Sequence, residues 1–79
     1  MKKRILIIGA CGQIGTELTN FLREKFGSHK VVASDIREGD DELMESGPFE
    51  VLDAMDYDAV QDVVINYEIT DVYLMAAML

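Results

Sequence analysis

Cysteine, proline and basic residues are all scarce in this sequence of 79 residues. The single cysteine, Cys11, has no second cysteine with which to form an internal disulfide or a metal-binding cluster. We therefore expect a reducing compartment, the cytoplasm. Only 7 lysines and arginines accompany 15 aspartates and glutamates, and the net charge of −8 argues against nucleic-acid partners and anionic membranes. No apolar run approaches the roughly 20 residues of a transmembrane helix, so we expect no membrane partner.

Apolar segments alternate with amphipathic ones, and 49% of the residues are hydrophobic, which is enough for a folded domain. The pattern predicts strands at residues 4–8, 30–34, 48–52 and 71–76, and helices at 14–26 and 57–67. An acidic connection, residues 36–47, contains a short helical turn around Leu43 and Met44. This order predicts an α/β fold with a Rossmann-type parallel sheet and flanking helices, the N-terminal portion (β-α-β-β-α-β) of a doubly wound domain.

Each predicted helix has an apolar face. In the first helix we expect five residues to face the sheet: Ile14, Leu18, Phe21, Leu22 and Phe26. Its charged residues, including Arg23, are placed mostly on the opposite side. In the second helix, Asp56 is predicted to cap the N-terminus, and the core stripe is Val60, Val63, Val64 and Tyr67.

A glycine-rich turn, residues 9–15 (GACGQIG), joins the first strand to the first helix. The start of a helix has backbone N–H groups without partners and carries the positive end of the helix dipole, so it attracts phosphate. Gly9 makes the tight turn, Gly12 lets the backbone approach a pyrophosphate, and Gly15 lets the helix pack closely on the sheet. We call these residues the glycine turn. They predict a dinucleotide site.

Asp35 strengthens this prediction, because it follows Gly15 by 20 residues and ends the next strand. Dinucleotide-binding domains place there the acid that binds the adenosine ribose. A carboxylate repels a 2′-phosphate, so NAD is favoured over NADP. Arg37 leaves NADP open, because an arginine could pair with that phosphate.

Two further positions are predicted to contribute to the site. Leu52 and Asp53, at the end of the third strand, are expected to flank the adenine, with a loop or helix-capping residue as the less favoured alternative for Asp53. Cys11 lies inside the glycine turn. A helix N-terminus lowers the pKa of a thiol, but no base is recognisable nearby, so a shape-giving spacer is favoured over a redox site.

The glycine turn, the run Ala33–Arg37, the run Gly47–Asp53 and the run Ile69–Ala77 together resemble the extended short-chain dehydrogenase/reductase family. The spacing G-x-x-G-x-x-G is the form used by that family. Sugar-nucleotide epimerases and dehydratases of the family usually carry His-Leu-Ala-Ala at the end of the fourth strand. Here the stretch reads Leu74-Met75-Ala76-Ala77, and the chain therefore most resembles the short-chain-type L-threonine 3-dehydrogenases of bacteria.

The resemblance implies roles for individual residues. The pyrophosphate would be wrapped by Gly9, Gly12, Gln13 and Ile14, and the ribose bound by Asp35, Ile36 and Arg37. The adenine would be held by Leu52 and Asp53, and the path towards the nicotinamide lined by Leu74, Ala76 and Ala77. The family's catalytic pair, Tyr-x-x-x-Lys, is not found in the sequence, so no catalytic residue is assigned. No metal ligand is assigned either.

The sequence thus predicts the NAD-binding segment of an L-threonine dehydrogenase, in which hydride passes from the 3-hydroxyl carbon to NAD and gives 2-amino-3-oxobutanoate. We expect residues 1–79 to be the N-terminal part of a longer NAD-binding domain, and the full-length protein to be a homodimer that binds L-threonine. Two alternatives remain open. One is an NAD-dependent sugar-nucleotide epimerase or dehydratase, and the other is a non-catalytic dinucleotide-binding module.

Overall fold

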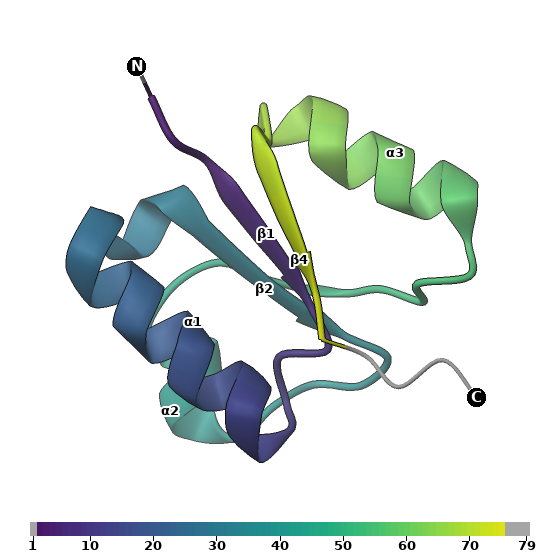
Figure 1. The fold of residues 1–79 in the computed structure, drawn as a ribbon. Helices are drawn as coiled ribbons and strands as arrows, with labels where there is room; N and C mark the ends of the chain where they lie inside the picture. Colours follow the sequence, from purple (N-terminus) through teal and green to yellow (C-terminus); the bar gives the residue numbers. More distant parts are fainter. Residues whose placement is uncertain (1, 76–79) are drawn as a thin grey trace.

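Four parallel strands form one sheet in the computed structural model, which describes residues 2–75 (Figure 1). The strands are β1 (Ile5–Ile8), β2 (Val31–Asp35), β3 (Phe49–Val51) and β4 (Asp71–Leu74), in the order β3-β2-β1-β4. All four predicted strands are present and parallel. β1 and β3 are shorter than predicted, and β2 has the predicted length but begins and ends one residue later. β4 ends at Leu74, and residue 76 of the predicted strand lies outside the described residues.

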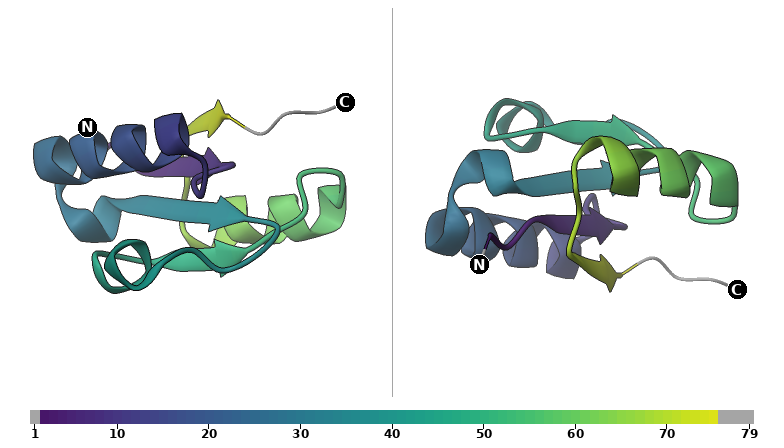
Figure 2. Two further views of the ribbon diagram at one scale, coloured as in Figure 1. Left: turned by 90° about the horizontal axis from the view of Figure 1, so that it is seen from below. Right: turned by 90° about the horizontal axis from the view of Figure 1, so that it is seen from above.

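Helices cover both faces of this sheet. On one face lie α1 (Gln13–Phe26) and the short α2 (Asp41–Glu45), and on the other lies α3 (Tyr57–Asn66) (Figures 1 and 2). A short 3-10 helix, Ser28–Lys30, leads from α1 into β2. The architecture is an α/β Rossmann-type fold, as the sequence predicted.

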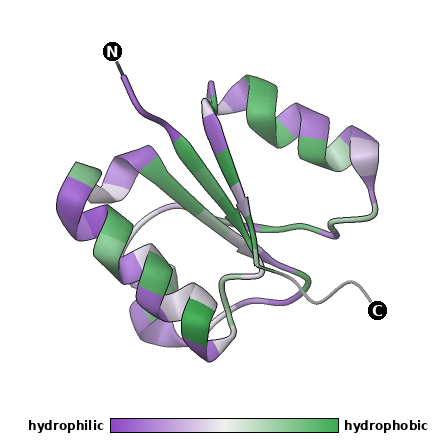
Figure 3. Cartoon of the chain, viewed as in Figure 1, coloured by the Kyte–Doolittle hydropathy of each residue, from purple (hydrophilic) through white to green (hydrophobic). Residues whose placement is uncertain are grey.

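Side chains of β1 alternate between the two faces and build two core clusters. Ile5 and Ile7 pack on the α1 side with Leu22 and Leu43. Leu6 and Ile8 pack on the α3 side, in the same cluster as Val63. All four β1 side chains are buried, because the strand is central and has helices above and below it. Figure 3 shows the hydrophobic strands β1 and β2 at the centre of the fold and helices in which hydrophobic and hydrophilic residues alternate.

The orientation of α1 differs from the prediction. Ile14 and Phe21, expected in the core, are 68% and 60% exposed, whereas Thr19 is fully buried. The cause is Gly15, where a Cβ atom would overlap the carbonyl oxygen of Gly9. This backbone contact fixes how α1 is rotated about its axis, so the residues at steps of three or four from Gly15 face the sheet.

Arg23 is the second correction, since it was placed on the outer face of α1 but is only 4% exposed. Its guanidinium donates to the carbonyl oxygens of Val31 (3.0 Å) and Pro48 (2.6 Å) and to the Ser46 hydroxyl (2.8 Å). A weaker bond of 3.3 Å reaches the Leu43 carbonyl oxygen. Arg23 therefore ties α1 to β2 and to the whole connection between α2 and β3.

The two later helices begin as capping rules predict. The Asp56 side chain accepts a hydrogen bond from the Ala59 N–H at the start of α3, and Asp40 accepts one from the Leu43 N–H at the start of α2. The predicted stripe of α3 packs against the sheet, with Val63 buried and Tyr67 partly buried. Within residues 2–75, no helix has both the length and the apolar character needed to cross a membrane.

Candidate cofactor site

The predicted site lies where the carboxyl ends of the parallel strands meet. In the register of the sheet, Ile8 at the end of β1 pairs with Ser34 of β2 on one side and with Leu74 of β4 on the other. The connection from β1 to β2 runs through α1 on one face, while the connection from β3 to β4 runs through α3 on the opposite face. Open α/β sheets bind ligands at such a reversal, outside the carboxyl ends of the strands, which here is the end of β1.

The glycine turn is held against β2 by backbone hydrogen bonds. The N–H groups of Gly9 and Ala10 both donate to the Ser34 carbonyl oxygen, each at 2.9 Å. Gly9 has φ of +96°, a conformation that favours glycine. The Thr16 hydroxyl donates to the Ala10 carbonyl oxygen at 2.8 Å, which locks the turn to the first turn of α1. The loop is therefore fixed by contacts within the described chain.

The start of α1 is open. Its N-cap residue is Gly12, and within the described residues no side chain caps it, in contrast to the aspartates that cap α2 and α3. A Cβ atom built on Gly12 would meet nothing within 4 Å among the residues described. The N–H groups of the first helical turn, which includes Gln13 and Ile14, have no partners inside the helix. This arrangement leaves both room and donors for an anion.

Asp35 is brought to the glycine turn, as its spacing predicted. Its Oδ2 accepts a hydrogen bond of 2.9 Å from the Cys11 N–H, and its Oδ1 accepts one of 2.7 Å from the Ile36 N–H. A carboxylate has about four acceptor sites, so capacity remains for the two hydroxyls of a ribose. Ile36 and Arg37 follow directly and are exposed at the same edge of the sheet.

Cys11 belongs to the glycine turn and contacts the segment at the end of β2. Its sulfur donates to the Arg37 carbonyl oxygen at 3.5 Å. Burial raises the pKa of the Cys11 thiol, and the negative charge and hydrogen bond of Asp35 raise it further, against a smaller opposing effect of Arg37. The raised pKa favours the neutral thiol, and the role of Cys11 as a spacer stays a prediction.

Leu52 and Asp53 follow β3 and differ in their surroundings. The Leu52 side chain is only 4% exposed and packs in the core beneath α3. Its N–H donates to the Asp35 carbonyl oxygen at 2.8 Å. The Asp53 side chain is exposed and its Oδ1 accepts a hydrogen bond from the Met55 N–H at 2.9 Å. Their predicted contact with adenine stays a prediction.

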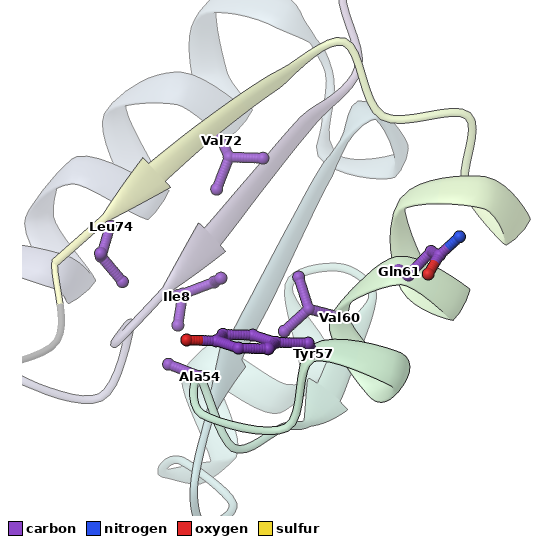
Figure 4. Close-up of a pocket in the computed structure, with 7 residues that line it drawn as sticks. All are labelled: Ile8, Ala54, Tyr57, Val60, Gln61, Val72 and Leu74. Carbon is purple, nitrogen blue, oxygen red and sulfur yellow. The ribbon is translucent and has the colours of Figure 1, made fainter.

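Leu74 ends β4 and is 54% exposed. Its side chain lines an apolar cavity of about 370 Å³ between β4 and α3, together with Ile8, Ala54, Tyr57, Val60, Gln61 and Val72 (Figure 4). The cavity opens on the α3 side of the sheet. Ala76 and Ala77, also predicted to line the cofactor path, lie outside the described residues.

Ser34 and Thr16 contribute to the site but were not predicted. Ser34 acts through its backbone carbonyl oxygen, and its hydroxyl donates to the Ile7 carbonyl oxygen at 2.7 Å. A backbone acceptor has no signature in a sequence. Thr16, directly after the last glycine of the turn, is a position where a hydroxyl can reach back to the loop.

Comparison with known proteins identifies the family. The model of the NAD dependent epimerase/dehydratase family matches residues 5–79. A human protein called inactive L-threonine 3-dehydrogenase, mitochondrial, is 43% identical over 76 residues, covering 96% of this chain and 33% of that protein. An uncharacterized epimerase/dehydratase of Staphylococcus aureus is 46% identical over 78 residues, covering 98% and 24% respectively.

Solved structures agree with these relatives. The L-threonine dehydrogenase of Clostridium difficile superposes with a TM-score of 0.91 at 39% identity, covering 99% of this chain and 25% of that one. The UDP-glucose 4-epimerase of Thermus thermophilus in complex with NAD gives a TM-score of 0.73 at 26% identity, covering 95% and 24%. The chain spans about a quarter to a third of the length of these proteins. With its Rossmann-type fold and its matched glycine turn, the chain belongs to the NAD-dependent epimerase/dehydratase family.

Proposed function

We propose that this chain is the NAD-binding part of an L-threonine 3-dehydrogenase, which oxidises the 3-hydroxyl of L-threonine to give 2-amino-3-oxobutanoate. The observation that carries the NAD site is the open start of α1 at Gly12, next to the Asp35 carboxylate. The threonine substrate is supported by the likeness to the Clostridium difficile L-threonine dehydrogenase.

The chain's own residues fit NAD in a definite way. The backbone of Gly12, Gln13 and Ile14 would face the pyrophosphate, because a side chain at Gly12 is absent and the helix start offers N–H donors. Asp35 would accept hydrogen bonds from the adenosine ribose while still holding the Cys11 N–H. Bound NAD supplies the hydride acceptor, and this chain supplies its position.

We also propose that the residues of catalysis and substrate binding lie outside these 79. The chain spans about a quarter of the Clostridium difficile enzyme's length. It contains tyrosines at 57, 67 and 73, but none is followed by a lysine four residues later. In this proposal residues 1–79 are the N-terminal part of a NAD-binding domain, and the intact protein is a cytoplasmic homodimer.

Two other functions have specific support. The Staphylococcus aureus relatives carry the name epimerase/dehydratase, and the Thermus thermophilus neighbour is a UDP-glucose 4-epimerase, which favours a sugar-nucleotide substrate. The human relative is called inactive, which favours a dinucleotide-binding protein without dehydrogenase activity.

One set of assays on the intact protein separates the three functions. Calorimetry with NAD tests the site, and NADH absorbance with L-threonine tests the reaction. UDP-glucose and dTDP-glucose serve as the competing substrates. NAD binding with threonine oxidation supports the proposal. Turnover of a sugar nucleotide without threonine oxidation contradicts the substrate, NAD binding without any turnover supports the non-catalytic module, and failure to bind NAD contradicts all three.

A further inference from the structure

Cys11 connects the glycine turn to residues 35–37, and these two segments form the ribose end of the candidate site. Its N–H donates to the Asp35 carboxylate at 2.9 Å, and its sulfur donates to the Arg37 carbonyl oxygen at 3.5 Å. These partners lie 24 and 26 residues further along the chain. One residue of the glycine turn therefore contacts the carboxylate of Asp35 and the backbone of Arg37, the two residues predicted to decide between NAD and NADP.

The segment after Asp35 also approaches Cys11 at Gly39. A Cβ atom built on Gly39 would lie 3.4 Å from the Cys11 sulfur and 2.6 Å from the Leu43 Cδ2 atom. Leu43 is itself buried in the core beneath α1. The sulfur of Cys11 and the buried Leu43 side chain thus both lie close to the backbone of Gly39, and the sulfur also contacts the Arg37 carbonyl oxygen.

The sulfur acts chiefly through its size, because a thiol is a weak hydrogen-bond donor. Replacing it by a hydrogen, as in alanine, removes the bulk of the sulfur beside Gly39 and the bond to the Arg37 carbonyl oxygen. The backbone of Arg37 then gains freedom to move, and its guanidinium gains access to positions beside the ribose. An arginine that reaches a 2′-phosphate offsets the repulsion from Asp35.

We propose that Cys11 is a positioning residue that sustains discrimination against NADP by holding residues 36–39, and Arg37 in particular, in a fixed path. This proposal rests on the NAD-binding function proposed above. It assigns no redox chemistry to the thiol.

The test measures the dissociation constants of NAD and NADP for the intact protein by calorimetry, for wild type, Cys11→Ala and Cys11→Ser. We expect Cys11→Ala to lower the ratio of the NADP constant to the NAD constant about threefold to fivefold, because the bulk of the sulfur and one weak hydrogen bond are lost together. Cys11→Ser keeps a donor and part of the volume, so its ratio should stay within about twofold of wild type.

A double-mutant cycle shows whether Cys11 acts through Arg37. In an Arg37→Ala background, Cys11→Ala should leave the ratio unchanged, because the group that it releases is gone. A Cys11→Ala protein that weakens NAD and NADP equally, or that changes the ratio as much without Arg37 as with it, overturns the proposal. Wild-type protein that binds neither cofactor overturns the proposed function as well, which separates the two failures.

Discussion

Gly15 lies against Gly9 so closely that a Cβ atom on Gly15 would overlap the Gly9 carbonyl oxygen and come within 2.9 Å of the Ala10 Cα atom. Gly12, three residues earlier, has open space around the same position within the described structure. Its backbone angles, φ −72° and ψ 168°, suit any residue. The two glycines therefore serve different ends: Gly15 is required by the fold, and Gly12 leaves space for a ligand.

This contrast gives a matched pair of variants. Gly15→Ala should destabilise the protein by about 1–3 kcal/mol, since the new methyl group forces the helix away from the turn. Gly12→Val should cost at most about 1 kcal/mol of stability, as a poor N-cap residue. It should nevertheless weaken NAD binding about tenfold to hundredfold by overpacking the ligand space. Chemical denaturation and calorimetry on both variants measure these effects.

The outcome that contradicts the proposed docking is normal NAD affinity in Gly12→Val. A Gly15→Ala protein as stable as wild type would show that the close approach of α1 to the turn is not needed. Loss of stability in both variants to the same extent would remove the distinction between the two glycines.

Asp35 should decide which dinucleotide binds. Asp35→Asn removes the charge and keeps one acceptor oxygen for the Cys11 or Ile36 N–H. We expect NAD binding to weaken about tenfold to hundredfold, as for loss of hydrogen bonds to a charged group, and the preference over NADP to shrink. Calorimetry with both cofactors gives the two constants.

Asp56→Asn is the control for this change in charge. Asp56 caps α3 through its side-chain oxygen, and asparagine caps helices equally well, so the charge changes by the same amount without loss of the cap. Its two dissociation constants should match those of wild type. Unchanged affinities for both cofactors in Asp35→Asn would rule out its role at the ribose.

The parts of the fold that repeat a local pattern could be predicted from the sequence. The strands, the parallel order of the elements and the Asp56 cap follow from apolar periodicity and from residue preferences that operate within a few positions. Asp35 was also placed correctly at the end of β2, because the carboxyl ends of parallel strands share one edge. Each of these depends on short-range chemistry.

The rotation of α1 could not be predicted in this way. Apolar spacing placed Ile14 and Phe21 in the core, but the contact of Gly15 with the backbone of Gly9 controls which face is buried. The partners of Arg23 and the role of Ser34 were missed because they involve backbone carbonyl groups of distant segments. A sequence pattern carries no information on a backbone acceptor until the fold is known.

Arg23 should be a major determinant of stability. Arg23→Met keeps most of the apolar stem but removes the hydrogen bonds of the guanidinium to the carbonyl oxygens of Val31 and Pro48 and to the Ser46 hydroxyl. We expect a loss of about 2–4 kcal/mol in the free energy of unfolding, because several hydrogen bonds to a buried charged group are lost together. Urea denaturation of the intact protein measures this loss.

Arg23→Lys tests the geometry rather than the charge. A single ammonium group cannot reach β2, Ser46 and Pro48 together, so the lysine variant should also be clearly destabilised. Lys25→Met, on the exposed side of the same helix, is the matched control and should change stability by less than about 0.5 kcal/mol. Equal stability of Arg23→Lys and wild type would show that charge alone suffices.

The alkylation rate of Cys11 should depend on pH in a way that reports its two neighbours. Burial, followed by the Asp35 charge and hydrogen bond, raises the pKa of the Cys11 thiol. Because the thiolate is the reactive form, the rate should rise at a higher pH than for an unperturbed cysteine, whose pKa is about 8.5. Mass spectrometry of the Cys11 peptide after iodoacetamide treatment gives the rate at each pH.

Two variants test the direction in which Asp35 and Arg37 each shift the pKa of Cys11. Asp35→Asn removes a negative charge that raises the pKa of Cys11, so its profile should move to lower pH, though burial keeps it above that of a free thiol. Arg37→Ala removes a positive charge that lowers the pKa of Cys11, so its profile should move to higher pH. Shifts in the reverse directions would mean that Cys11 does not lie between Asp35 and Arg37 in solution, and the positioning role inferred for it would fail with them.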